Sequence, residues 1–417
     1  MSKRTQLMAL ACLGMGTLAA MPSIQDGSVT LSQDASRKVT IAYTLENEPA
    51  IVTVDILTNG VSVGGSCLQT LTGDVNKRVA TGARTIFWQP HLDMPNAVVA
   101  AGETRAVVTA WAVGAPPDYM AVGLVATNTV RYYADRFAVL GGDTNDMYKT
   151  DWMLFRKIPA AGVKYRMGSP STESGRTAER ETAHIVELSY DFYLAVYELT
   201  QQQYINIHDG TKSTSFFSKT DDYPMRPVEC TTFNSVRGVA DNGYNWPANG
   251  HAVAPGSTLG RMRARVGNGL VIDLPTEAQW EYACRAGTGT AYYHGSSFGN
   301  DMTHIRSYLI GGTDGGNSNQ TAAQGGTGIV GSLLPNAWGL YDTLGNVSEA
   351  CLDWFAADNT TCDPEQGPTS SSGSKRSRRG GAWNNGYVEV RSAFRSPRDP
   401  GGQHYATDGY RFAVHLH

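Results

Sequence analysis

The stretch of residues 336–355, NAWGLYDTLGNVSEACLDWF, constrains the fold of this chain more than any other part of the sequence. Gly and Asp interrupt it too often for an amphipathic helix, and its apolar residues do not alternate cleanly enough for one long strand. The pattern predicts a short strand around residues 338–341, a tight turn at residues 344–346, and a second short strand through Asp353 and Trp354.

Two carboxylates flank this turn. Asp342 and Glu349 lie seven residues apart, and Gly345 and Asn346 allow the backbone to fold back between them. Carboxylates and backbone carbonyls on a folded loop suit calcium, a hard cation that takes about six to eight oxygen ligands. The alternative is an Asx-type turn whose acids face water. Spacing alone favours that turn, because the pattern does not match a standard calcium loop.

Composition and charge narrow the class of protein. Gly is abundant, with 46 residues, and charged residues make up only 17% of the chain, which favours a loop-rich and strand-rich globular protein. The 34 basic and 38 acidic residues give a formal charge of −4, so no basic face is implied and nucleic acid is not expected as a partner. We interpret the basic run at residues 375–379 as a solvated loop, because it follows a Ser/Gly segment.

The N-terminus has the form of a short secretory signal. Lys3 and Arg4 precede an apolar segment at residues 7–20, with cleavage expected near Ala19 or Ala20. No other stretch approaches 18 apolar residues in a row, so no membrane span is expected. These features predict a signal peptide at residues 1–20 and an exported bacterial protein that is secreted, periplasmic or at the cell surface.

Five cysteines remain after the signal is removed: Cys67, Cys230, Cys284, Cys351 and Cys362. An odd number in an oxidising compartment permits at most two bridges. The close spacing of Cys351 and Cys362 favours them as a pair, although sequence does not determine connectivity.

The first third of the chain has the pattern of an antiparallel sandwich. Short segments rich in β-branched residues alternate between residues 28 and 111, and apolar residues occupy every second position in residues 52–56. We predict an immunoglobulin- or fibronectin-like β-sandwich at residues 22–115, acting as a spacer or adhesion module. A linker is expected at residues 116–149, because Pro116 and Pro117 open it and glycines recur near its end.

The remaining residues, 150–417, mix short strands with two capped helices. Thr200 can cap a helix over the residues that follow it. The strongest helix signal is LPTEAQWEYACR at residues 274–285, where Thr276 and Gln279 form a capping box and Gly287 ends the helix. His415 and His417 are interpreted as a solvated pair in the C-terminal tail.

Seven blocks in this region resemble, in order, the formylglycine-generating enzyme family, also called sulfatase-modifying factors. They are MGSP (167–170), VYELTQ (196–201), LPTEAQWEYACRAGT (274–288), PNAWGLYDTLGNVSE (335–349), RGGAW (379–383), RSAFR (391–395) and GYRF (409–412). The resemblance spans about residues 150–417 and excludes the N-terminal sandwich. It implies an α+β fold whose C-terminal part is a C-type-lectin-like sulfatase-modifying-factor domain.

The resemblance also implies a structural calcium ion. In the family, the turn before the Trp-rich strand binds calcium through a side-chain oxygen, two backbone carbonyls and a carboxylate. By position, these ligands are Asp342, Gly345, Val347 and Glu349. This chain departs from the family at the two residues beside Glu349, where Ser348 and Ala350 replace the usual tryptophans. No good match to the family's other calcium site is found upstream.

The catalytic sulfur of the family is missing. Its enzymes bind copper(I) between two cysteines after a Gly-Gly-Ser segment, and no oxygen ligand replaces thiolate for copper(I). Here no cysteine follows Cys362, and Tyr387 occupies the place of the second active cysteine. A family disulfide is also broken, since Ser392 stands where the partner of Cys284 is expected. Copper and formylglycine generation are therefore not expected.

A binding surface remains in the segment that forms the family's substrate groove. Aromatic and Arg side chains mixed with Asn are typical of binding patches. The expected ligand-binding residues are Trp383, Asn384, Asn385, Tyr387, Arg391, Arg395 and His404, and Arg398 and Tyr405 come from the same segment. The alternative is that Trp383 and Arg391 only pack and pair within the sheet.

We therefore predict a non-catalytic binding module that offers this groove to a peptide, glycan or protein ligand. The alternative is an oxidoreductase of the same family with altered active-site chemistry, which would be an oxygen-dependent oxidase.

Overall fold

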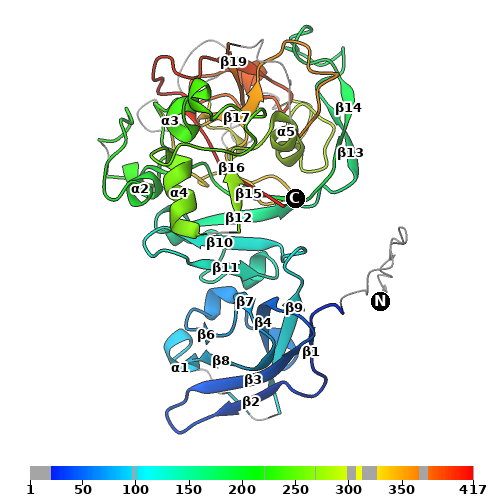
Figure 1. The fold of residues 1–417 in the computed structure, drawn as a ribbon, viewed down its shortest axis with the longest axis vertical. Coiled ribbons are helices and arrows are strands. Elements are labelled where there is room, and N and C mark those ends of the chain that lie inside the picture. Colours follow the sequence, from blue (N-terminus) through cyan, green and yellow to red (C-terminus); the bar gives the residue numbers. More distant parts are fainter. Residues whose placement is uncertain are drawn as a thin grey trace.

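The computed structural model describes residues 20–95, 99–100, 102–219, 221–267, 269–297, 307–311, 326–365 and 374–416. The predicted signal peptide lies outside these residues except for Ala20. The N-terminal strands form one end of an elongated molecule and the C-terminal two-thirds form the larger body at the other end (Figure 1). None of the helices in the described residues has the length and apolar character needed to cross a membrane.

The N-terminal region consists of two antiparallel sheets. The first contains β1 (Ser23–Ile24), β2 (Thr30–Gln33), β3 (Val39–Glu46), β6 (Thr72–Gly73) and β8 (Gly82–Trp88). The second contains β4 (Ala50–Thr58), β5 (Val61–Ser62), β7 (Lys77–Val79) and β9 (Thr104–Trp111). Short helical turns, η1 (Gly65–Cys67) and α1 (Pro90–Asp93), connect the strands.

Both sheets contribute side chains to one core. In β3 every second residue is buried, from Val39 to Leu45, as the alternation in the sequence predicts. Val52, Ile56 and Trp88 join the same apolar cluster from the other strands. The region is therefore β-rich with a sandwich-like core, and its assignment to the immunoglobulin or fibronectin type stays a prediction.

The segment at residues 116–149, predicted to be a linker, is part of the fold. It contains β10 (Tyr119–Gly123), β11 (Val130–Tyr133), η2 (Arg136–Ala138) and η3 (Asp146–Lys149). β10 pairs with β11 and with β12 (Trp152–Ile158). The linker prediction is wrong because prolines and glycines occur only toward the two ends of the segment, whereas the apolar residues of β10 form a buried strand between them.

One apolar cluster joins the two ends of the molecule. Tyr119, Tyr133 and Tyr148 from this segment pack in the same cluster as the inner residues of β3, β4 and β8. Tyr197 and Tyr341, from farther along the chain, belong to it too, with their rings stacked 5.1 Å apart. The N-terminal sheets are therefore packed onto the C-terminal body through a continuous hydrophobic core.

A six-stranded antiparallel sheet lies at the base of the C-terminal body. Its order is β11-β10-β12-β15-β21-β16, with β15 at Phe192–Ala195, β16 at Val271–Asp273 and β21 at Ala413–His415. The last strand, β21, sits between β15 and β16, so the C-terminus returns to the start of the body (Figure 1). His415 is therefore buried in the sheet, and its prediction as a solvated tail residue is wrong, whereas His417 lies outside the described residues.

Four helices and a hairpin surround this sheet. They are α2 (Gln201–Ile207), α3 (Phe233–Arg237), α4 (Thr258–Val266), α5 (Glu277–Arg285) and the hairpin of β13 (Val163–Met167) and β14 (His184–Leu188). The capping boxes at Thr200 and Thr276 both form. α5 ends at Arg285, and Ala286, one residue before the glycine predicted to close the helix, takes the left-handed conformation. The remaining short turns are η4 (Tyr223–Met225), η5 (Ala240–Asn242) and η6 (Tyr387–Val390).

A second sheet carries the stretch that constrains the fold. Its order is β19-β18-β17-β20, with β17 at Ser348–Trp354, β18 at Arg376–Arg379, β19 at Ser396–Arg398 and β20 at Asp408–Gly409. The predicted strand through Asp353 and Trp354 is β17. The strand predicted at residues 338–341 is absent, because Asn336 holds that segment in a turn by accepting from the backbone N–H groups of Trp338 and Leu340.

The basic run at residues 375–379 is not a solvated loop, because four of its residues form β18 and all four are buried. Each guanidinium has its own partner: Arg379 pairs with Glu281, Arg378 lies against Asp408, and Arg376 stacks on the ring of Trp354. Sequence patterns among neighbouring residues cannot predict these partners, because the partners come from distant parts of the chain.

Candidate ligand groove and buried carboxylate site

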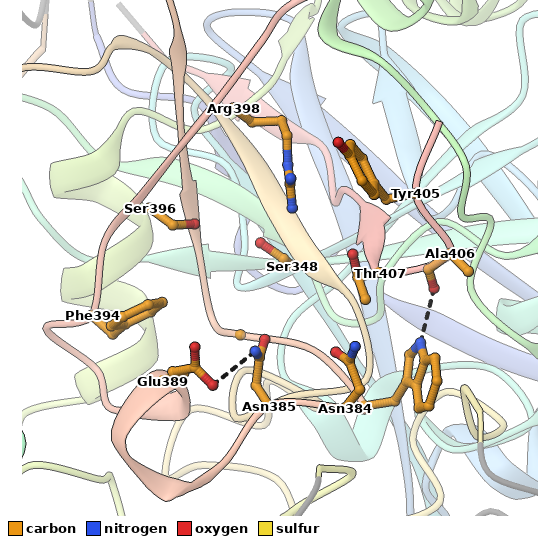
Figure 2. Close-up of a pocket in the computed structure, with 12 residues that line it drawn as sticks. Ser348, Asn384, Asn385, Glu389, Phe394, Ser396, Arg398, Tyr405, Ala406 and Thr407 are labelled. Carbon is orange, nitrogen blue, oxygen red and sulfur yellow. Dashed lines mark hydrogen bonds between the residues drawn. The ribbon is translucent and has the colours of Figure 1, made fainter. Parts of the chain in front are cut away.

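A cavity of about 480 Å³ opens over one face of the second sheet (Figure 2). Its lining comes from the start of β17, the loop after β18, η6, β19 and the approach to β20. The residues are Ser348, Gly381, Trp383, Asn384, Asn385, Glu389, Phe394, Ser396, Arg398, Tyr405, Ala406 and Thr407. We call this cavity the groove.

Two glycines turn the chain out of β18 and into the groove. Gly380 and Gly381 have φ of 86° and 69°, a conformation that favours glycine. A Cβ at Gly381 would lie 2.5 Å from the carbonyl oxygen of Glu389. The loop is then held by Asn385, whose Oδ1 accepts from the Ala382 N–H at 2.8 Å and whose Nδ2 donates to Glu389 at 2.9 Å. The conformation of this loop is therefore held by the two glycines and by the hydrogen bonds of Asn385.

Trp383 forms part of the groove lining. Its Nε1–H donates to the carbonyl oxygen of Ala406 at 3.0 Å, and its ring meets Phe217 edge to face at 5.3 Å. This residue therefore both lines the groove and joins the loop after β18 to the loop before β20.

The structure divides the seven predicted ligand-binding residues. Trp383, Asn384 and Asn385 line the groove, whereas Tyr387, Arg391, Arg395 and His404 do not. Tyr387 packs against the apolar cluster of Trp280 and Cys284.

Two of the predicted arginines are buried in ion pairs. Arg391 is 1% exposed and binds Glu173 and Glu181, while Arg395 is 2% exposed and binds Glu277. Both arginines therefore have a structural role instead of the predicted role in binding a ligand, because a guanidinium buried away from water needs a carboxylate partner.

His404 remains exposed, with Nδ1 2.6 Å from the carbonyl oxygen of Cys230. Four further lining residues were not expected from the sequence: Ser348, Glu389, Phe394 and Ser396. Sequence alternation in β19 places Ser396 and Arg398 on one face, which was an available signal for two members of the groove.

The predicted calcium ligands lie in a buried cluster of carboxylates beneath the turn. Glu349 is 1% exposed and accepts from Arg411 at 2.7 Å through each oxygen and from the indole of Trp280 at 2.8 Å. Glu198 is fully buried and accepts from Asn346 at 2.6 Å and the Val347 N–H at 3.0 Å.

Asp342 completes this cluster. Its Oδ2 accepts from the Gly331 N–H at 2.6 Å, but its buried Oδ1 has no hydrogen-bond partner in the part of the chain that the structure describes. The pKa of Asp342 is raised to about 6, chiefly by burial, with a smaller rise from the charge of Glu349, while the Gly331 N–H and Arg411 act in the opposite direction. Burial also raises the pKa of Glu198 well above its usual range, and Asp342 and Glu349 add to this rise.

Three carboxylates thus surround one guanidinium, and one carboxylate oxygen is unpartnered. These features fit a bound divalent cation, which would supply positive charge and a partner for Asp342. No group of three or more His, Cys, Asp or Glu side chains suited to a metal is found among the described residues, but the expected set uses two side chains and two backbone carbonyls.

The five cysteines of the described residues are all unbonded. The predicted Cys351–Cys362 bridge is therefore wrong. The side chain of Cys351 points into the cluster of Trp280 and Cys284, whereas Cys362 lies half-buried in a turn after β17. The Sγ of Cys284 lies 3.6 Å from the hydroxyl of Ser392, the residue expected in place of a disulfide partner.

The chain is similar in sequence to several known proteins. A family model described as "Sulfatase-modifying factor enzyme 1-like domain" matches residues 157–416. The formylglycine-generating enzyme of Thermomonospora curvata is 38% identical over 124 residues, which cover 26% of this chain and 38% of that protein. The serine/threonine-protein kinase pkn1 of Chlamydia pneumoniae is 33% identical over 146 residues, covering 34% of this chain and 21% of that protein. The matches thus span well under half the length of these curated relatives.

Two solved structures are also similar to the chain. PvdO from Pseudomonas aeruginosa has 22% identity and a TM-score of 0.48, covering 63% of this chain and 94% of that one. Treponema denticola variable protein 1 has 25% identity and a TM-score of 0.46, covering 63% and 95%.

The predicted fold class is confirmed: the protein is α+β, with a C-type-lectin-like sulfatase-modifying-factor domain after a β-rich N-terminal region. Because the family model covers residues 157–416, which is more than half of its length, the chain belongs to the sulfatase-modifying factor enzyme 1-like family.

Proposed function

We propose that this chain is an exported, non-catalytic binding protein that uses the groove to hold a peptide, glycan or protein ligand. The observation that carries the proposal is the chemistry of the groove. Its described lining residues present hydroxyls, amides, aromatic rings, one carboxylate and one guanidinium, and none of them is a cysteine. This mixture suits non-covalent recognition, in which a few polar groups orient a ligand against apolar walls.

The family's copper chemistry requires two thiolates at the groove. Copper(I) selects soft sulfur ligands, and the chain has no cysteine after Cys362. Cys284 and Cys351 are buried away from solvent, and burial raises the pKa of both thiols, so neither provides a ready thiolate. Tyr387, at the place of the second active cysteine, is partly buried against the cluster of Trp280 and Cys284 and gives no support to the alternative of an oxidase.

Calcium is part of the same proposal, as a structural ion at Asp342, Gly345, Val347 and Glu349. The unpartnered Oδ1 of Asp342 and the excess of buried carboxylates support it. The ion would hold the turn that precedes β17, and β17 supplies Ser348 to the groove. Calcium therefore would act on the groove through the position of this strand.

Export rests on the sequence of residues 1–20, with its two early basic residues and apolar segment. The proposal allows a secreted, a periplasmic or a cell-surface protein. N-terminal sequencing of the mature protein tests it, because cleavage is expected near Ala19 or Ala20.

Two assays test the function. The mature protein is first incubated with copper(I), oxygen and a cysteine-containing sulfatase peptide, and mass spectrometry monitors the peptide. No aldehyde is expected, and formation of formylglycine would overturn the proposal.

The second assay screens peptides, glycans and candidate proteins for binding to the same protein. Trp383→Ala should weaken the affinity for any ligand of the groove at least tenfold. The control is Trp111→Ala, which replaces a half-buried tryptophan in β9 of the N-terminal sheets and should leave the affinity unchanged. Ligands that bind both variants equally do not use the groove.

A further inference from the structure

One end of the groove carries more positive than negative charge. Arg378 and Arg398 share a single carboxylate, Asp408, at 3.7 Å and 2.9 Å. Arg378 is buried, and burial lowers its pKa, with the charge of Arg398 lowering it further. Two guanidinium groups for one carboxylate leave about one positive charge unbalanced at this end.

Arg398 is the member of this group that faces the groove. Its side chain is 32% exposed, and its guanidinium points toward Ser348 (Figure 2). The Nε and Nη2 nitrogens face Asp408, which leaves Nη1 for a ligand. Tyr405 lies 4.3 Å from this guanidinium and fixes it from the side.

Two hydroxyl groups adjoin the same space. Ser348 and Ser396 both line the groove, and within the described chain neither hydroxyl has a hydrogen bond to another residue. In contrast, the hydroxyl of Thr407 is used, because it donates to Asp408 at 3.1 Å. A guanidinium beside two unused hydroxyl donors is a suitable environment for an oxyanion.

We propose that the groove recognises an acidic peptide, and that a carboxylate side chain of this peptide binds Arg398 between Ser348 and Ser396. This inference rests on the proposed function and names its ligand class. The carboxylate would accept a charge-assisted hydrogen bond from Nη1 and further bonds from the two serine hydroxyls.

The opposite end of the groove suits a peptide backbone. Asn384 has an amide side chain that makes no hydrogen bond within the described residues, so it can donate to and accept from a peptide group. Glu389 uses Oε2 for Asn385 and the Gly386 N–H, which leaves Oε1 as an acceptor for a peptide N–H.

Two of the three aromatic rings that line the groove favour a peptide over a glycan. A sugar ring stacks on an open aromatic face, but the guanidinium of Arg398 covers the Tyr405 ring and Trp383 is held against Phe217. These rings instead form walls for apolar side chains. The groove therefore combines a carboxylate subsite, a backbone subsite and apolar walls.

The test measures fluorescence anisotropy with the full-length mature protein and three labelled probes. The probes are a hexapeptide rich in glutamate, the same peptide with glutamine in place of glutamate, and oligogalacturonate. We expect the glutamate peptide to bind at least tenfold more tightly than the glutamine peptide, with a preference that weakens at high salt. Oligogalacturonate, which offers carboxylates on a sugar chain, should bind no better than the glutamine peptide.

Two variants locate the preference. Arg398→Gln removes the guanidinium, and Ser396→Asp places a negative charge in the subsite while keeping the Arg398–Asp408 pair. Each should abolish the preference for glutamate. Arg261→Gln is the matched control, since this exposed arginine pairs with Asp209 outside the groove and its loss should change nothing.

The outcomes separate this inference from the proposed function. Equal binding of both peptides, lost in Trp383→Ala, would leave the groove as a binding site and overturn the carboxylate subsite. Preferential binding of oligogalacturonate would overturn the choice of peptide. If the wild-type protein binds no anionic probe, or keeps its preference in both subsite variants, the carboxylate subsite is also overturned.

Discussion

The strongest prediction concerns Asp342 and its response to calcium. An Asp342→Asn variant removes the charge and keeps the shape of the side chain. The remaining amide oxygen can still accept from the Gly331 N–H. The backbone tolerates the change, since Asp342 has φ of 59° and asparagine adopts this left-handed conformation readily.

The size of the effect follows from the pKa. Burial raises the pKa of Asp342 from 3.8 to about 6, and a rise of this size corresponds to about 3 kcal/mol of lost stability once the carboxyl is ionised. A raised acid pKa means that the folded state holds its proton more tightly than the unfolded state. Calcium-free protein should therefore lose this stability as the pH rises from about 4 to about 6, and the loss should persist above pH 6.

The assay compares wild type and Asp342→Asn by urea denaturation, in chelator and in calcium, from pH 4.5 to 7.5. In chelator, the variant should gain stability over wild type as the pH rises, by up to about 3 kcal/mol at pH 7.5. In calcium, the ion should stabilise wild type by about 3 kcal/mol at a hundred times its Kd, while the variant should respond weakly.

Asp353→Asn is the matched control. Burial raises the pKa of this buried aspartate to about 7, and its Oδ2 accepts from the Glu277 N–H at 2.7 Å, outside the predicted calcium ligands. The control should shift the pH dependence and leave the calcium response intact. Equal stability of wild type in chelator and calcium at pH 7.5, with no gain in Asp342→Asn, would refute the reasoning.

Three further predictions follow from buried contacts. Ser392→Cys should form a disulfide with Cys284 under oxidising conditions, removing two thiols from a quantitative thiol assay and raising Tm, with Cys284→Ala/Ser392→Cys as the control that loses the effect. Glu281→Gln should destabilise the fold by about 3–5 kcal/mol in urea denaturation, because Arg285 and Arg379 lose their shared carboxylate; an unchanged midpoint would contradict this. In the native protein, a thiol reagent should label Cys67 and, more slowly, Cys230 and Cys362, because burial raises the pKa of these two thiols. It should reach Cys284 and Cys351 only after denaturation, and a bridge between Cys351 and Cys362 in peptide mapping would contradict the structure.

Local patterns predicted much of the fold. The alternation in residues 52–56 predicted a strand with Val52, Val54 and Ile56 buried, and these residues are buried in β4, although Thr53 is buried as well. The N-cap at Thr200 and the capping box at Thr276 predicted where α2 and α5 begin. Both signals depend on neighbours within four positions, so they survive in the folded protein. The ordered sequence blocks gave the family, because several short motifs in one order are specific when each alone is not.

Long-range pairing explains what the sequence could not provide. Arg391 and Arg395 have the composition of a binding patch, but Glu173, Glu181 and Glu277 lie more than 100 residues away and bury them. The same reason applies to the arginines of β18. In the groove, Ser348 and Ser396 are separated by 48 positions, and only the pairing of β17, β18 and β19 brings them together.

The apolar cluster between the N-terminal sheets and the C-terminal body limits how this protein can be divided. A fragment that begins at residue 150 would lack β10, an internal strand of the six-stranded sheet, and would leave the edge of β12 unpaired. Tyr197 and Tyr341 would then be exposed to solvent. The fragment would have both an unpaired strand edge and an exposed hydrophobic surface, and we expect it to aggregate. A recombinant form of the lectin-like part alone would therefore have to begin before Tyr119, so that β10 is kept. The apolar side chains that it buries against the N-terminal sheets would also have to be replaced by polar ones.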